Sequence, residues 1–217
     1  MKTNKQKIAV FAAGTEHKDK GATGLRNLIV KSRSNNPEIN FDVVAVISNY
    51  PYGSAKAIAD EYGILFLHLG APFTRERYID VVEKSGADWF ALSGWLKLVL
   101  GLDPAKTFNI HPGSTTRYGG KGMFGIHVHE AVVKAGDITT QATMHFVDEE
   151  YDKGPIVFRK FVDVKPTDTA EILQKNVNKV EHEYQPLITS MIVNGEISWD
   201  GENPDSLQVP QGYKWLK

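Results

Sequence analysis

Two side chains that could act together on one reacting atom lie two positions apart in the segment Phe108-Asn109-Ile110-His111. Side chains alternate between the two faces of an extended strand, so Asn109 and His111 would share one face and Ile110 would take the other. A Pro-Gly-Ser turn follows at once. An amide donor and an imidazole would therefore converge at the end of a strand, where they could stabilise negative charge on an oxygen atom.

Acidic residues that could orient such a histidine follow a later apolar segment, and they are Asp148, Glu149, Glu150 and Asp152. An acidic turn of this kind is usually solvated. In the alternative interpretation, one carboxylate approaches His111 when the strands close into a sheet, and it then orients the imidazole and favours its protonated form. The spacing does not select one of the four acids.

The other histidines give weaker signals. His127 and His129 lie in a predicted helix, where residues two apart do not face each other, so no metal site is expected from this pair. His145 alternates within a predicted strand, and it either lines a site or packs in the core as a hydrogen-bonded histidine. The sequence leaves that choice open.

A glycine-rich loop near the N-terminus is a candidate phosphate site. Gly14, Gly21 and Gly24 lie between a predicted strand and a predicted helix, where backbone N–H groups and the helix N-terminus could bind an anion. Their spacing fits neither the dinucleotide-binding motif nor the P-loop motif. A phosphate site and an ordinary glycine-rich turn both remain possible.

The elements that must position these residues alternate along the first half of the chain. Apolar runs predict strands at residues 8–13, 41–47, 64–67 and 89–93, and amphipathic segments predict crossover helices at 25–34, 54–62 and 75–85. This order predicts an α/β fold with a doubly wound, Rossmann-like, mostly parallel sheet and helices on both faces. Ligands of such folds bind beyond the carboxyl ends of the strands.

The second half of the chain follows a different order. A helix is predicted at residues 126–134, and two strands at 141–147 and 155–164 are expected to add an antiparallel C-terminal strand to the sheet. A long helix is predicted from Asp168, with Asp168 and Glu171 in capping-box spacing. Pro186 is expected to kink this helix.

Length and composition bound the remaining possibilities. The 217 residues, of which 41% are hydrophobic, predict one domain over residues 1–217. The 25 basic and 26 acidic residues give no basic footprint for nucleic acid or a membrane surface, so we expect small-molecule substrates. The chain has no cysteine, which excludes thiolate chemistry and fits a cytoplasmic protein. The oligomeric state is not predicted.

The motif Asn109-Ile110-His111-Pro112, together with HFVDEEYDKGPIV at residues 145–157, resembles the folate-dependent formyltransferase family. The likeness covers nearly the whole chain, and by position the family's catalytic Asn, His and Asp match Asn109, His111 and Asp152. It implies the formyltransferase fold and the co-substrate 10-formyltetrahydrofolate, with no metal. The implied reaction transfers a formyl group to the primary amine of glycinamide ribonucleotide in purine biosynthesis.

The resemblance also implies two sets of binding residues. The phosphate and ribose of the acceptor would be bound by Gly14, Ala22, Thr23, Gly24, Asn178 and Glu181. The folate would be bound by Arg75, Leu96, Lys97, Leu98, Val147, Asp148 and Glu149.

Loops at residues 15–24 and 113–123 depart from the family pattern, and both border the expected acceptor pocket. Two alternatives therefore stay open, namely formyl transfer to another amine such as an amino sugar nucleotide, and a non-catalytic nucleotide-binding or folate-binding module. The presence of Asn109, His111 and Asp152 together favours the enzyme, because a site that no longer catalysed the reaction would not need all three residues.

Overall fold

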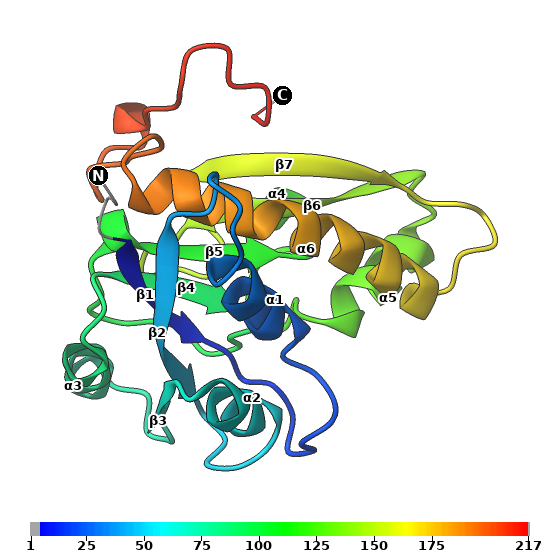
Figure 1. The fold of residues 1–217 in the computed structure, drawn as a ribbon. Helices are drawn as coiled ribbons and strands as arrows, with labels where there is room; N and C mark the ends of the chain where they lie inside the picture. The colour runs from blue at the N-terminus through cyan, green and yellow to red at the C-terminus, as the bar shows by residue number, and fades with distance from the viewer. Residues whose placement is uncertain (1–4, 217) are drawn as a thin grey trace.

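The computed structural model describes residues 5–216 and contains a seven-stranded sheet in the order β3-β2-β1-β4-β5-β6-β7 (Figure 1). Each predicted strand is present, with ends that differ by one or two residues. The strands are β1 (Gln6–Phe11), β2 (Phe41–Ser48), β3 (Leu65–His68), β4 (Trp89–Ser93), β5 (Thr107–His111), β6 (Thr139–Phe146) and β7 (Ile156–Asp163).

The strand directions confirm the predicted fold class. Strands β1 to β5 are parallel, β6 is antiparallel to β5, and β7 is antiparallel to β6. The antiparallel strand is thus β6, and the edge strand β7 runs in the same direction as the first five. The chain moves outward from β1 to β3 and then returns to β4 beside β1, so the topological switch point lies between β1 and β4.

The predicted helices are also present, together with a short helix, α4, that the sequence did not indicate. The helices are α1 (Thr23–Ser32), α2 (Ser54–Tyr62), α3 (Arg75–Ser85), α4 (Thr115–Tyr118), α5 (Ile126–Ala135) and α6 (Ala170–Val193), with 3-10 turns at Pro104–Lys106 and Pro204–Ser206.

Two hydrophobic cores lie on opposite faces of the sheet. Along β1, Ile8 and Val10 belong to the core under α1, α5 and α6, while Ala9 and Phe11 belong to the core under α3. Strands that are buried on both faces carry continuous apolar runs. This explains why the sequence located the central strands closely.

The start of α6 corrects one prediction. The N-cap is Thr169, whose Oγ1 accepts a hydrogen bond from the N–H of Ile172 at 3.4 Å. Asp168 instead accepts from the N–H of Lys165 at 3.0 Å, within the preceding turn. The predicted capping box is therefore wrong, and the helix continues through Pro186 without a break.

The last residues of the described chain pack back onto β7. The backbone N–H of Arg159 donates to the carbonyl of Trp215 at 2.7 Å, and the hydroxyl of Tyr213 donates to the carbonyl of Val157 at 2.8 Å. These contacts provide hydrogen-bond partners for backbone groups of the edge strand β7 that would otherwise be free.

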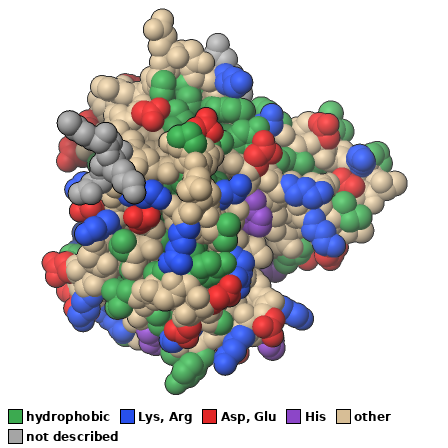
Figure 2. All heavy atoms as spheres, viewed as in Figure 1, with side chains coloured by type: hydrophobic (Ala, Val, Ile, Leu, Met, Phe, Trp, Pro, Cys, Tyr) green, Lys and Arg blue, Asp and Glu red, His purple; other side chains and the backbone are tan. Residues whose placement is uncertain are grey.

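Charges of both signs are mixed over the face drawn in Figure 2, where Lys and Arg side chains alternate with Asp and Glu. Among residues 5–216, no helix is both long enough and apolar enough to cross a lipid bilayer.

Candidate active site

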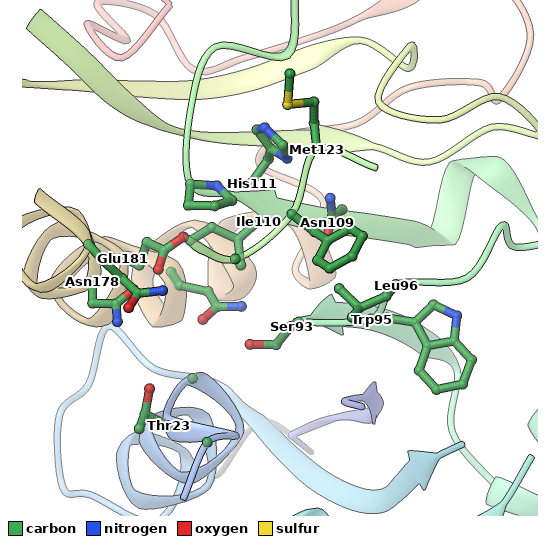
Figure 3. Close-up of a pocket in the computed structure, with 18 of the residues that line it drawn as sticks. Thr23, Ser93, Trp95, Leu96, Asn109, Ile110, His111, Met123, Asn178 and Glu181 are labelled. Carbon is green, nitrogen blue, oxygen red and sulfur yellow. The ribbon is translucent and has the colours of Figure 1, made fainter. Parts of the chain in front are cut away.

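A cavity of about 380 Å³ opens at the carboxyl ends of the central strands, beside the switch point (Figure 3). Its walls come from the start of α1, the ends of β4 and β5, the glycine-rich loop before α5, and one face of α6. Asn109, His111 and Asp152 all line it. The structure therefore brings Asp152, from the loop between β6 and β7, to the two residues at the end of β5.

Asn109 is paired across the sheet with His145, which lies directly opposite it in the β5–β6 register. The His145 Nδ1 is 2.6 Å from the carbonyl oxygen of Phe146, and because a carbonyl only accepts, this nitrogen donates. In the neutral tautomer, Nε2 then accepts one amide hydrogen of Asn109, at an Nδ2–Nε2 distance of 3.1 Å. One N–H of Asn109 is held and the other is left for a ligand.

His111 is almost fully buried, with 4% of its side chain exposed. Its Nε2 donates to the carbonyl of Tyr118 at 2.8 Å, and its Nδ1 lies 3.8 Å from Oδ1 of Asp152. Burial lowers the pKa of His111, and the negative charge of Asp152 offsets only part of that effect. His111 is therefore neutral at pH 7, with a lone pair on Nδ1. Asp152 favours the protonated form, as expected, but desolvation of the ring outweighs this attraction and keeps the pKa below its usual value.

Asp152 is the acid of its segment that lies within 4 Å of both His111 and His145. Its Oδ2 accepts the N–H of Gly120 at 2.8 Å, and its Oδ1 is 3.4 Å from Nε2 of His145. Burial raises the pKa of Asp152, but a proton on His145 or His111 and the Gly120 N–H favour the carboxylate, and together they hold the pKa below its usual value. Asp152 is thus a carboxylate at neutral pH.

The backbone around Asp152 is unusual in two ways. Asp152 has a φ of 58°, a left-handed conformation that Asp tolerates better than most residues. A β-carbon on Gly154 would overlap the carbonyl oxygen of Phe146, so only glycine allows the loop to close onto the end of β6. This close approach fixes where Asp152 enters the cavity.

The N-terminus of α1 forms the opposite end of the cavity. Ala22, at φ 53° and ψ 30°, precedes the helix, and no side chain caps its first turn. Ala22, Thr23 and Gly24 line the cavity, as predicted for an anion site. Gly14 does not line it, because Gly14 forms the turn after β1 and packs against Ser54.

Asn178 and Glu181 project into the cavity from α6, across from Thr23 (Figure 3). Burial raises the pKa of Glu181 to about 7, so this carboxyl group titrates near neutral pH. Polar contacts connect α1 and α6 beside the cavity. Asn27 donates to the carbonyl of His182 at 2.8 Å, and Nε2 of His182 lies 3.2 Å from Oγ1 of Thr23.

The residues predicted to bind folate lie in three different places in the structure. Lys97, Leu98, Val147 and Asp148 surround a hollow of about 40 Å³ that adjoins the main cavity at Asn109. Such a volume holds about one water molecule, so the hollow by itself is smaller than a bicyclic heterocycle. Leu96 lines the main cavity instead.

Arg75 and Glu149 line neither the cavity nor the hollow. They pair with each other at 2.5 Å, and Glu149 also accepts the N–H of Gly101 at 3.1 Å. Both side chains are about half exposed. Their predicted folate contact is not supported by this arrangement, because each charge is already paired outside the cavity.

The cavity residues that were not identified from the sequence include three buried polar ones, namely Ser93, His129 and Gln185. Gln185 lies seven positions after Asn178 and four after Glu181, a spacing that places all three on one helix face, so a signal was present. His129 is buried, and burial lowers its pKa to about 4. Nothing in its local sequence indicated this burial.

Comparisons with known proteins identify relatives of the chain. The family model described as Formyl transferase matches residues 6–189. The chloroplastic phosphoribosylglycinamide formyltransferase of Arabidopsis thaliana is 32% identical to this chain over 218 residues. The match covers 95% of this chain and 72% of that protein. The trifunctional purine biosynthetic protein adenosine-3 of Gallus gallus is 30% identical, over 91% of this chain and 19% of its own length.

A solved structure has the same fold. Glycinamide ribonucleotide transformylase 1 from Symbiobacterium toebii superimposes with a TM-score of 0.80 at 23% identity, covering 95% of this chain and 94% of that chain. The fold of this chain is therefore one already observed in a crystal structure.

Proposed function

Because the chain belongs to the formyl transferase family, we propose that it transfers the formyl group of 10-formyltetrahydrofolate to the primary amine of glycinamide ribonucleotide, in purine biosynthesis. The observation that carries the proposal is the placement of Asn109, His111 and Asp152 in one cavity. The opposite end of that cavity is an uncapped helix N-terminus suited to a phosphate.

The chemistry requires a site for negative charge and a path for one proton. The amine nitrogen attacks the formyl carbon, and charge develops on the formyl oxygen, towards which the free N–H of Asn109 can donate. One such preorganised donor is typically worth about 3 to 4 kcal/mol of barrier. The bond between the formyl carbon and the folate nitrogen then breaks, and the proton lost by the amine is transferred to that nitrogen.

The neutral state of His111 fits the role of proton carrier. Its Nδ1 lone pair faces the Asp152 side, while Nε2–H is held by the Tyr118 carbonyl. When Nδ1 accepts the amine proton, Asp152 stabilises the imidazolium that forms, and the proton can be passed on to the folate nitrogen. Burial lowers the pKa of His111 and so weakens it as a proton acceptor. The Asp152 carboxylate opposes this effect, and His111 therefore depends on Asp152 to accept the proton.

The acceptor is proposed from the other end of the cavity. Its phosphate would bind the N–H groups at the start of α1, beside Ala22, Thr23 and Gly24. Its ribose hydroxyls would bind Glu181, whose carboxylate accepts hydrogen bonds, and Asn178 lies one turn away on α6. The name of the Arabidopsis relative, a phosphoribosylglycinamide formyltransferase, supports this acceptor.

The folate would enter beside Asn109, where Lys97, Leu98, Val147 and Asp148 meet. Apolar walls with a few backbone polar groups suit a flat heterocycle that forms hydrogen bonds along one edge. The cytoplasmic location also stays a prediction, supported by the lack of cysteine, although the named plant relatives are chloroplastic.

The test is an assay of the purified protein with 10-formyltetrahydrofolate and three amines, namely glycinamide ribonucleotide, its dephosphorylated nucleoside and an amino sugar nucleotide. We expect release of the deformylated folate and a formylated product with the ribonucleotide alone. Formylation of the amino sugar nucleotide alone would overturn the acceptor, and binding of folate without formylation of any of the three amines would favour a non-catalytic module.

Calorimetry separates the phosphate contact from the chemistry. The ribonucleotide and its dephosphorylated nucleoside would be titrated in the presence of a non-reactive folate. We expect much weaker binding of the nucleoside, because the helix N-terminus then has no anion to bind. Equal affinities would remove the phosphate site from α1 while leaving the roles of Asn109, His111 and Asp152 unchanged.

A further inference from the structure

Two polar side chains, Ser93 and Gln185, meet on the floor of the cavity and have no role in the chemistry described above. Gln185 on α6 is 1% exposed, and its Oε1 has no hydrogen-bond partner among residues 5–216. Ser93, at the end of β4, is also buried and lines the same cavity. Figure 3 shows Ser93 between Thr23, at the phosphate end, and Asn109, at the catalytic end.

Gly24 is what allows the two side chains to approach the same point. A β-carbon on Gly24 would overlap Oγ of Ser93 and would lie 3.5 Å from Oε1 of Gln185. The two polar groups therefore face one small space, which is open because residue 24 has no side chain. Any acceptor that reaches from α1 to Asn109 passes over this space.

An unpaired buried oxygen is costly in the free protein. A buried acceptor without a donor typically costs about 1 to 3 kcal/mol, and most buried polar groups are paired. Thr189, one turn later on α6, also has a buried hydroxyl without a partner among the described residues, but it does not line the cavity. Gln185 differs from Thr189 in lining the cavity, so a ligand bound there lies against it.

The acceptor carries a matching group between its phosphate and its amine. In glycinamide ribonucleotide, a secondary amide joins the aminomethyl group to the ribose, and it offers one N–H donor and one carbonyl acceptor. A serine hydroxyl donates and accepts, and rotation of the Gln185 carboxamide presents either its oxygen or its nitrogen. We propose that Gln185 and Ser93 bind this amide and so select acceptors that contain it. The inference rests on the proposed function and deepens it.

Gln185→Leu tests the inference, since leucine has a similar volume but cannot form a hydrogen bond. We expect the KM for glycinamide ribonucleotide to rise about tenfold, which corresponds to about 1.4 kcal/mol, typical of one lost hydrogen bond. The kcat and the KM for the folate should change less than about twofold. The reason is that the lost hydrogen bond stabilises the bound acceptor equally in the ground state and in the transition state. The melting temperature of the free protein should stay the same or rise. Ser93→Ala should raise the KM in the same direction.

Thr189→Val is the matched control, because it removes a buried, unpartnered hydroxyl from the same helix outside the cavity. We expect its KM for the acceptor to equal that of the unmodified protein. A second comparison uses an acceptor analogue in which a methylene replaces the amide N–H. Gln185→Leu should weaken binding of this analogue far less than binding of glycinamide ribonucleotide.

The outcomes separate this inference from the function it rests on. If the unmodified protein formylates glycinamide ribonucleotide and Gln185→Leu leaves its KM unchanged, the inference is wrong and the function stands. An equal loss of affinity for the amide and for the methylene analogue would also overturn it, since Gln185 would then act only through packing. If the unmodified protein does not formylate the ribonucleotide, both proposals fail.

Discussion

At the scale of single residues, the cavity holds three polar groups in defined states. Asn109 has one N–H held by His145, and His111 has one N–H held by the Tyr118 carbonyl. Asn109 therefore keeps a second N–H for a ligand, and His111 keeps the lone pair on Nδ1. The imidazole is neutral in the free protein because burial lowers its pKa.

Asn109→Ala and His111→Ala should each reduce kcat by a factor of about 10² to 10³, with little change in folate affinity. Asn109→Ala removes the donor to the developing oxyanion, and His111→Ala removes the proton acceptor. Single-turnover kinetics would measure the chemical step directly. Near-full turnover in either variant would contradict the assigned role.

Asp152→Asn should lower the plateau rate and move the acidic limb of the kcat/KM profile to lower pH. The carboxylate opposes the effect of burial on His111, so its neutralisation lowers the pKa of His111 further. Glu149→Gln provides the control, because Glu149 pairs with Arg75 on the surface. The assignment would be wrong if Glu149→Gln abolished activity and Asp152→Asn did not.

Glu181→Gln should change how stability depends on pH. The pKa of Glu181 is raised from 4.5 to about 7, so the folded protein binds a proton more tightly than the unfolded chain does. The stability that this proton contributes is present in full below pH 4.5 and is lost as the pH rises through 7. The melting temperature of the variant relative to the unmodified protein should therefore be higher at pH 8 than at pH 5. A difference that does not vary with pH would refute the raised pKa.

At the scale of elements, α6 forms the wall of the cavity at which we propose that the acceptor binds. Asn178, Glu181 and Gln185 recur at helical spacing and face one cavity, while Leu173, Val177 and Ile188 face the core. One amphipathic helix therefore provides both the packing and the recognition.

The N-cap of α6 gives a stability prediction at this scale. Thr169→Ala should lower the free energy of unfolding by about 1 kcal/mol, because the N–H of Ile172 loses its acceptor. Urea denaturation would measure the change. The acceptor KM should stay constant, since Thr169 does not line the cavity. A larger loss for Asp168→Asn than for Thr169→Ala would restore the capping box that the structure contradicts.

At the scale of the whole molecule, two cores share one sheet. Because each central strand contributes side chains to both cores, neither face can lose its packing without exposing the other side of the same strands. We therefore expect one cooperative unfolding transition, with coincident near-UV and far-UV circular dichroism curves. Two separated transitions would contradict the prediction of a single domain.

Local sequence determined most of the fold. The period-2 and period-3.6 patterns depend on neighbours along the chain, and they predicted the strands and the main helices of the described residues. They also predicted that Asn109 and His111 occur at the end of one strand. The same patterns missed the N-cap of α6 by one residue, because Thr169 and Asp168 are both good capping residues.

Tertiary structure alone decided the state and the partners of the site. The β5–β6 register placed His145 opposite Asn109, and loop closure at Gly154 placed Asp152 beside His111. Burial outweighed the effect of Asp152 on the pKa of His111, and Arg75 and Glu149 form an ion pair outside the cavity. Register, desolvation and ion pairing depend on residues far apart in the chain, so no local pattern encodes them.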